Sequence, residues 1–335
     1  MPLGKNQKVL VWIIISLCIL AIPIGFFSSH GAGKGDSDSD DTDFSFGHTD
    51  HIQVIRLTGM ISDDDDEGFL PSISSEDAAG ALKKLRKAIK STHVKGILLR
   101  VNSPGGTIGA SQELTSQVKE YRKTGRPVVV SMGDLAASGG YYISSAADKI
   151  VCEPGTLTGS IGVIMNLMNF KGLADKVGVQ PEVVKSGAFK DIANPMRPMT
   201  PEERKILQDL VMDAYGQFVG QVADGRKMKL DVVKKLADGR VYSGAQAIKL
   251  GLVDELGGYD EAIADLQKLC MEKFDLKEKL PVKDKPSGLI SALMEAAFSG
   301  GPLRASAPKT ISVLGELLPR SMSSRYLNMP LWMMQ

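Results

Sequence analysis

The sequence predicts an α/β domain with a mostly parallel sheet, preceded by one transmembrane helix. Short apolar runs alternate with amphipathic stretches from residue 51 onward, as expected when each strand is followed by a crossover helix. A segment without charged residues lies near the start of the chain and is long enough to cross a bilayer. The chain has 335 residues, of which 43% are hydrophobic, so it can bury a sizeable core.

Residues 9–27 form the predicted transmembrane anchor. As a helix, this uncharged segment spans roughly 28 Å, close to the hydrocarbon thickness of a bilayer. Lys5 and Lys8 precede it and an aspartate-rich segment follows, so the positive-inside rule places residues 1–8 in the cytoplasm. The rest of the chain would then lie on the extracytoplasmic side of the inner or plasma membrane. A signal peptide cleaved near Ser29 is the alternative, but the apolar run is longer than the usual signal-peptide core.

Three further regions are predicted from composition. Residues 28–50 are rich in Gly, Ser and Asp, which indicates a flexible acidic spacer. The folded domain is expected over residues 51–273. Residues 274–335 predict a linker and an apolar C-terminal tail, which would pack on its own domain or on a neighbouring subunit.

The strands of the domain are predicted from short apolar runs. GILLRVN and RPVVVSM are nearly continuous apolar runs, as expected of strands covered by helices on both faces. IQVIRL, KIVCE and PEVVKSG have the length and composition of further strands. The predicted strands are therefore residues 52–57, 96–102, 126–132, 149–153 and 181–187.

Helices are predicted between these strands. Apolar residues recur at helical spacing in residues 75–89, with Ser75 as the candidate N-cap. Residues 109–123 form the next predicted helix, and residues 138–147 begin another. Residues 201–223 predict a long helix, since they open with a proline, which is favoured in the first turn.

Composition and charge exclude several classes of function. The 40 basic and 39 acidic side chains give a net charge of +1, which offers no electrostatic basis for nucleic-acid binding. The three cysteines include no C-x-x-C pair and cannot form a disulfide framework. All four histidines lie in the first third of the chain, so an H-E-x-x-H metal site is excluded and a Ser-His-Asp triad is disfavoured.

Two glycine-bearing turns carry the candidate chemistry. VNSPGGTIGA and MGDLAASGGYY each follow a predicted central strand, and in a parallel sheet both turns leave from the same carboxyl edge. Neither turn has the spacing of a nucleotide-binding loop. In the second turn, Ser138 stands at a helix start between small residues, a setting that suits a nucleophile beside backbone N–H donors. The alternative is that Ser138 only caps the helix.

Five segments together resemble one protein family. They lie between residues 52 and 270 and read NSPGG, DLAASGGYYISSAADKI, TGSIGVI, KSGAFKD and GRVYSGAQAIKLGLVDELGG. The sequence is similar to the signal peptide peptidase A family of serine proteases, whose fold is shared with the Clp protease and crotonases. The length resembles the short form of that family, which has a single catalytic domain per chain.

The resemblance implies a membrane-anchored serine endopeptidase with a Ser-Lys dyad. Ser138 matches the nucleophile, Lys190 the general base, and Ser160 the serine that orients the base. Gly106 and Gly139 match the oxyanion hole, with Gly105 as the alternative to Gly106 and the amide of Ser138 itself as the alternative to Gly139. The implied substrates are remnant signal peptides and similar apolar peptides, which such enzymes cleave without a cofactor. Related proteins form homo-oligomers, in which a dyad can be split between subunits.

A lysine base also makes chemical sense for this chain. A serine hydroxyl needs a neighbouring base, and no histidine lies near these segments. A lysine acts as a base only when it is neutral, and burial among apolar residues such as Phe189 favours the neutral form. Lys185 and Lys149 are the rival bases. Lys149 follows Asp148, with which it is expected to form an ion pair.

An alternative function keeps the same fold without peptidase chemistry. A non-proteolytic crotonase-like module would bind acyl-thioesters or serve as a membrane scaffold, and it would not need Lys190. Labelling of Ser138 by a fluorophosphonate probe distinguishes the two functions, because it requires an activated serine.

Overall fold

The computed structural model describes residues 49–63 and 76–284. The predicted anchor at residues 9–27, the apolar C-terminal tail and almost all of the spacer at 28–50 lie outside these residues. Among the helices that are described, none is long and apolar enough to cross a bilayer. The anchor and its topology therefore stay predictions from the sequence.

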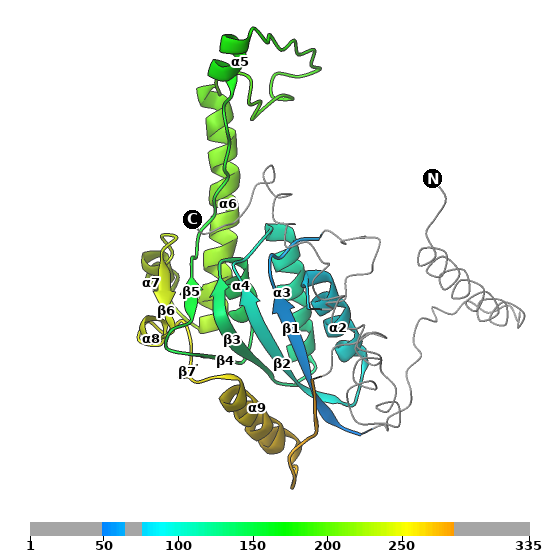
Figure 1. The fold of residues 1–335 in the computed structure, drawn as a ribbon. Helices are drawn as coiled ribbons and strands as arrows, with labels where there is room; N and C mark the ends of the chain where they lie inside the picture. The colour runs from blue at the N-terminus through cyan, green and yellow to red at the C-terminus, as the bar shows by residue number, and fades with distance from the viewer. Residues whose placement is uncertain (1–48, 64–75, 285–335) are drawn as a thin grey trace, which may run out of the picture. The chain divides into compact units, whose positions relative to one another are not determined.

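In the described residues, one 8-stranded sheet forms the centre of the domain (Figure 1). Its order is β6-β5-β3-β2-β1-β8, and β4 pairs with both β3 and β7. Every pair is parallel except β5 with β6, so the predicted mostly parallel α/β sheet is confirmed. The strands are β1 (His51–Thr58), β2 (Val94–Ser103), β3 (Val128–Ala137), β4 (Lys149–Cys152), β5 (Leu157–Gly159), β6 (Val241–Ser243), β7 (Glu255–Leu256) and β8 (Val282–Lys283).

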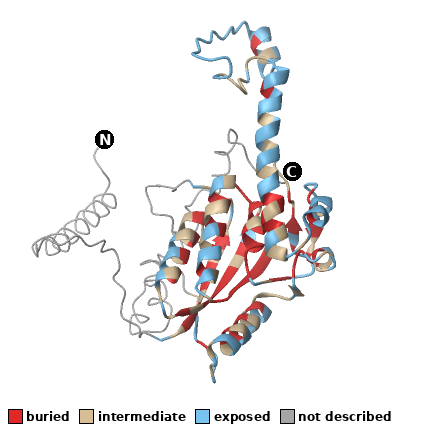
Figure 2. Ribbon diagram, turned by 180° about the vertical axis from the view of Figure 1, so that it is seen from behind, coloured by how far each residue is buried: buried red, intermediate tan, exposed pale blue. Residues whose placement is uncertain are grey.

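Helices cover both faces of the central strands, which Figure 2 shows as buried. Alternate side chains of a strand point to opposite faces. Ile55 and Leu57 of β1 belong to the core that packs under the helices of one face, whereas Ile52 and Val54 pack with the helix of the other. The first face carries α2 (Ala78–Lys90), α3 (Ile108–Lys123) and α4 (Gly139–Ser144), and the second carries α9 (Tyr259–Phe274).

Helix α6 (Pro201–Arg226) is only partly packed on the sheet. Its C-terminal part contributes Phe218, Val219 and Val222 to the core. Its N-terminal part extends away from the sheet and is exposed, and α5 (Lys171–Val177) lies at its far end (Figures 1 and 2). The short helices α7 (Leu230–Leu236) and α8 (Gly244–Ala247) lie beside β6.

Three local predictions differ from the structure. The N-cap of α2 is Asp77, whose side chain accepts from Gly80 N at 2.7 Å, while Ser75 lies outside the described residues. The predicted strand at 181–187 is wrong, because these extended residues have no neighbouring strand and are exposed, Val184 fully so at 102%. The folded part also continues beyond residue 273, since β8 pairs with β1.

Candidate functional site

Ser138 lies where the central strand β3 passes into helix α4. The first half of β3 pairs with β4 and its second half pairs with β5, so its C-terminal end is held between β2 and β5. Ser138 follows directly, with φ 52° and ψ −120°, and is 4% exposed. A positive φ at a residue other than glycine costs on the order of 1–3 kcal/mol and persists only where the surroundings enforce it.

The surroundings of Ser138 enforce this conformation through its backbone. Ser138 N donates to Gly159 O at 2.9 Å, and Tyr142 N donates to Ser138 O at 2.8 Å. The hydroxyl makes no capping hydrogen bond to the helix that it precedes. The alternative in which Ser138 serves as an N-cap therefore does not hold, and the hydroxyl is free for another use.

Two backbone N–H groups lie beside Ser138. Gly105, at φ 106°, is packed so closely that a Cβ there would lie 2.8 Å from both Ser138 Cβ and Gly139 N. A Cβ on Gly139 would lie 3.2 Å from Gly106 N. Gly139 is the first residue of α4, where an N–H has no partner within the helix, and Gly106 N donates no hydrogen bond within the described residues. These two donors are arranged as an oxyanion hole would require.

A turn from another part of the chain supports the Gly106 side of this arrangement. Ile61 N donates to Gly105 O at 2.9 Å, and Thr107 N donates to Ile61 O at 2.7 Å. A Cβ on Gly106 would lie 1.8 Å from Ile61 O, so only glycine fits. Ile61 therefore holds the backbone on either side of Gly106 in place.

Ser160 lies directly after β5 and close to the nucleophile turn. Its predecessor Gly159 accepts the Ser138 N–H, and Ser160 N donates to Arg240 O at 2.9 Å. Ser160 also has a positive φ, 49°. The structure thus brings together Ser138, Ser160, Gly106 and Gly139, four of the five residues predicted for the site.

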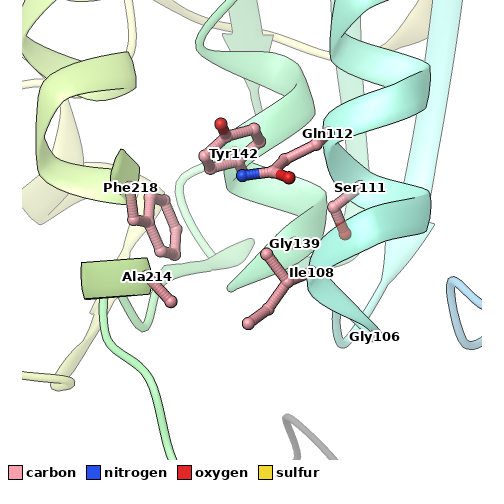
Figure 3. Close-up of a pocket in the computed structure, with 8 residues that line it drawn as sticks. All are labelled: Gly106, Ile108, Ser111, Gln112, Gly139, Tyr142, Ala214 and Phe218. Atoms are coloured by element: carbon pink, nitrogen blue, oxygen red, sulfur yellow. The ribbon is translucent and has the colours of Figure 1, made fainter. Parts of the chain in front are cut away.

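A shallow, open pocket lies next to this turn (Figure 3). Apolar groups of three helices meet there, and the rings of Tyr142 and Phe218 contact edge to face with centroids 5.1 Å apart. Gln112 adds an amide at the rim and donates to Gln217 Oε1 at 2.6 Å. The lining residues are Gly106, Ile108, Ser111, Gln112, Gly139, Tyr142, Ala214 and Phe218.

Sequence reasoning missed this pocket. Ala214 and Phe218 come from α6, more than seventy residues after the nucleophile turn along the chain. Their spacing of four residues places them on one helix face, a pattern that indicates burial. It does not indicate which residues they face, because that depends on how α6 packs beside α3 and α4.

Lys190 is not part of this arrangement within one chain. It lies in the turn at residues 188–193, between α5 and α6, and its side chain is exposed. This segment lies near α5, at the far end of α6 from the sheet (Figure 1). No contact joins Lys190 to Ser138 or Ser160 within the described part of the chain.

The three candidate lysines differ in their partners. Lys185 Nζ forms an ion pair with Asp191 at 2.6 Å. Lys149 pairs with Glu255 and Asp265 at 2.5 and 2.6 Å. The predicted pair of Lys149 with Asp148 is wrong, because Asp148 pairs with Arg122 instead.

The pairing of Lys149 has an electrostatic consequence. Burial lowers its pKa, but the hydrogen bonds that Lys149 donates to Asp265 and Glu255 outweigh burial and raise the pKa overall. Lys149 is therefore held as a cation. Lys190, in contrast, makes no hydrogen bond or ion pair through its side chain within the described residues.

A parallel sheet that presents a strained serine at a strand-to-helix turn, beside free backbone donors, is the arrangement of enzymes that use a serine nucleophile. The family described as Peptidase family S49 matches residues 120–272, which include Ser138, Ser160 and Lys190. Putative protease slr0021 of Synechocystis sp. is 46% identical over 205 residues, 59% of this chain and 74% of that protein. The chain belongs to peptidase family S49.

Two further relatives carry more specific names. The putative signal peptide peptidase SppA of Enterococcus faecium is 43% identical over 214 residues, 64% of this chain and 62% of that protein. The chloroplastic serine protease SPPA of Arabidopsis thaliana is 35% identical over 242 residues, 72% of this chain and 36% of that protein. The match thus spans less than two thirds of both proteins. The resemblance to signal peptide peptidases is confirmed at the level of the family.

Proposed function

We propose that this chain is a serine endopeptidase in which Ser138 is the nucleophile and Lys190 of a second copy is the general base. One observation carries the proposal: Ser138 is strained, lacks a capping bond and faces two backbone N–H groups, while Lys190 is exposed and far from it. A site with a nucleophile and an oxyanion hole but no base is incomplete. A second copy of the chain supplies the missing lysine without any rearrangement of the first.

The proposed reaction proceeds through an acyl-enzyme. Neutral Lys190 takes the proton of the Ser138 hydroxyl as Oγ attacks the peptide carbonyl carbon. The N–H groups of Gly106 and Gly139 stabilise the negative charge on the carbonyl oxygen. The lysine ammonium then returns its proton to the departing amine, and water hydrolyses the ester by the same steps. Ser160 orients Lys190 by a hydrogen bond, and no cofactor takes part.

The pocket beside Ser138 supports apolar peptides as substrates. Its lining is formed mainly by Ile108, Ala214, Tyr142 and Phe218, which accommodate an apolar side chain next to the scissile bond. Signal peptides have an apolar core, so their remnants match this pocket. The name of the Enterococcus faecium relative supports the same substrate class.

The predicted transmembrane anchor indicates where the proposed enzyme would act. Residues 9–27 would hold the enzyme in the inner or plasma membrane by a single pass, with the catalytic domain on the extracytoplasmic side. Peptides left in a bilayer would then meet the catalytic domain at the membrane surface. A homo-oligomer around such an anchor would bring each Ser138 to a neighbour's Lys190.

Subunit mixing tests the split dyad directly. Full chains carrying Ser138→Ala and Lys190→Ala are each expected to be inactive on a fluorogenic apolar peptide in detergent. Co-expressed together, they should regain activity, because some sites combine an intact Ser138 with an intact Lys190 of the other variant. Inactivity of the mixture would mean that both groups must come from one chain.

A fluorophosphonate probe tests the nucleophile separately. The wild-type chain should be labelled, and Ser138→Ala should not. Ser144→Ala is a suitable control, because Ser144 lies in α4 with its hydroxyl donating to Gly140 O at 2.7 Å. Absence of labelling in the wild type would support the non-proteolytic crotonase-like module instead.

A further inference from the structure

The turn that carries Lys190 is held only weakly by its own backbone. Lys190 N donates to Gly187 O at 3.2 Å, and Ile192 N donates to Phe189 O at 3.1 Å. These residues belong to no strand or helix, and the Lys190 side chain is exposed. Asn194 N also donates to Asp191 O at 3.1 Å. These short-range hydrogen bonds do not set the direction of the turn, so contacts made by side chains determine where Lys190 Nζ lies.

Arg197 supplies such contacts. Its Nε donates to Asp191 Oδ2 at 2.9 Å, and its Nη2 donates to the Asp191 carbonyl oxygen at 3.0 Å. The same guanidinium donates to Glu203, from Nη1 to Oε2 at 2.8 Å and from Nη2 to Oε1. A planar guanidinium holds two carboxylates in fixed directions, which a lysine ammonium does not. Arg197 therefore joins the residue after Lys190 to the first turn of α6.

Glu203, which accepts from Arg197, is itself held in place at the start of α6. Its side chain is 2% exposed and completes a capping box, in which Thr200 N donates to Glu203 Oε2 at 2.9 Å. Glu203 N in turn donates to Thr200 Oγ1 at 3.2 Å. Hydrogen bonds from Arg197 and from the Thr200 backbone lower the pKa of Glu203 to about 2, so the carboxylate stays charged at neutral pH.

Asp191 completes the network on the other side of Arg197. Its second carboxylate oxygen accepts from Lys185 Nζ at 2.6 Å. Hydrogen bonds from Arg197 and Lys185 hold the pKa of Asp191 well below its usual range. The two cations and two carboxylates neutralise one another, and Lys190 remains outside the network. The ion pairs of Asp191 thus hold the turn in place, and the Lys190 ammonium takes part in none of them within the described residues.

We propose that Arg197 is a positioning residue for the base: it fixes the Lys190 turn on the start of α6 and so directs Lys190 toward Ser138 of a second copy. The proposal rests on the proposed function, since it gives Lys190 the role of base. A displacement of about 1 Å in a reacting group can cost 10²-fold in rate. Loss of Arg197 therefore acts on the chemical step and much less on substrate binding.

The first test separates turnover from binding. In the full chain, Arg197→Ala should lower kcat by about 10–100-fold with a nearly unchanged KM. Arg197→Lys should recover only part of the loss, because an ammonium cannot hold both carboxylates. Lys205→Ala is the matched control, since it breaks an exposed ion pair with Asp209 within α6. Normal kcat in Arg197→Ala would overturn the proposal.

A second pair of variants separates positioning from helix stability. Glu203→Gln keeps a side chain that is accepted in a capping box but removes the charge that holds Arg197. Thr200→Ala removes the cap hydroxyl and keeps the ion pair. We expect Glu203→Gln to lose more kcat and Thr200→Ala to lose more melting temperature. A larger loss of kcat in Thr200→Ala would mean that only the helix start matters.

Subunit mixing gives a readout that general destabilisation would not produce. A mixture of Arg197→Ala with Ser138→Ala should regain activity. In a randomly mixed oligomer, about a quarter of the sites combine the intact Ser138 of the first variant with the correctly held Lys190 of the second. A mixture of Arg197→Ala with Lys190→Ala should not regain activity, because every Lys190 is then missing or displaced. Equal behaviour of the two mixtures would overturn the proposal.

Comparing Lys190→Ala with Arg197→Ala distinguishes a wrong base from a wrong positioning residue. Normal turnover in Lys190→Ala would refute the proposed function itself. An inactive Lys190→Ala together with a normal Arg197→Ala would refute only the positioning role.

Discussion

Ser138 and Lys190 lie in two regions of the chain that are held by different forces. Ser138 is 4% exposed and its backbone is bonded to β5 and α4, so one chain alone determines its conformation. Lys190 lies on an exposed turn beyond the end of the sheet, where surface ion pairs replace a core. One chain thus determines the conformation around Ser138, whereas Lys190 makes no contact with Ser138 within the described residues.

The difference also shows how activity could depend on assembly. A serine beside a prepared oxyanion hole but without a base has little reactivity. The dyad would form only when a second copy binds, so a solitary chain would be inactive. We call Ser138 with Gly106, Gly139 and Ser160 the buried half-site of the proposed dyad, and the Lys190 turn at residues 188–193 the exposed half-site.

The largest effect is expected from Lys190→Arg. Arginine keeps the positive charge but does not lose its proton in practice, so it cannot act as a base. Turnover should fall by about 10⁴-fold, the upper end of what general-base catalysis contributes. Hydrolysis of a fluorogenic peptide by the full chain measures this loss.

The rival lysine provides the control for this prediction. Lys185→Ala should reduce turnover only a few-fold, since Lys185 supports the turn without touching substrate. Near-normal turnover in Lys190→Arg together with an inactive Lys185→Ala would identify Lys185 as the base.

The next largest loss of turnover is expected from a change at Gly139, in the buried half-site. In Gly139→Ala, the new Cβ would lie 2.4 Å from Ser111 Oγ and 3.2 Å from Gly106 N, so the backbone around the oxyanion hole must shift. Displacing an oxyanion donor costs about 10²–10³-fold in kcat. Single-turnover kinetics on an ester substrate would measure this loss.

Gly109→Ala is its matched control. Gly109 lies in α3 with nothing within 4 Å of a new Cβ, and alanine is the better helix former. Activity should stay at the wild-type level with equal or higher stability. A comparable loss of kcat in both variants would show that the oxyanion geometry is not what Gly139 protects.

The contrast also explains which parts of the site were predictable from sequence. Ser138, Gly106 and Gly139 come from turns that follow central strands, and parallel strands bring such turns to one edge. The strand pattern therefore located the two turns, and the resemblance to the peptidase family singled out these residues within them. The pocket residues Ala214 and Phe218 depend on the packing of α6, which no local pattern specifies.

The exposed half-site was predicted less well for a related reason. PEVVKSG has the composition of a strand, but within this chain no strand lies beside it. β-propensity describes how a segment fits a pleated surface, and it does not supply the neighbouring strand. Likewise, Lys190 was proposed from the resemblance of KSGAFKD to the family, whereas Arg197 belongs to no motif and its role is apparent only from its contacts.

A smaller effect is expected from the pocket. Ala214→Leu adds volume to the lining and should lower kcat/KM about 10-fold for peptides with a large apolar side chain before the scissile bond. Peptides with alanine at that position should be cut at nearly the wild-type rate. Met212→Leu, an exposed change on the same helix, is the control. Equal losses for both peptides would place the side-chain pocket elsewhere.

The smallest effect concerns acid stability of the exposed half-site. The hydrogen bond from Arg197 lowers the pKa of Glu203 to about 2, and an unfolded glutamate titrates near 4.3. A carboxyl with a depressed pKa stabilises the folded state fully above its unfolded value and loses that contribution as the pH falls through its folded value. The melting temperature of wild type should therefore exceed that of Glu203→Gln at pH 7, and the difference should shrink between about pH 4.5 and pH 2. Lys205→Ala, which breaks the exposed ion pair with Asp209, is the control. Calorimetry at pH 7, 4 and 2.5 measures this, and a difference that grows on acidification would mean that the charge of Glu203 does not hold the turn.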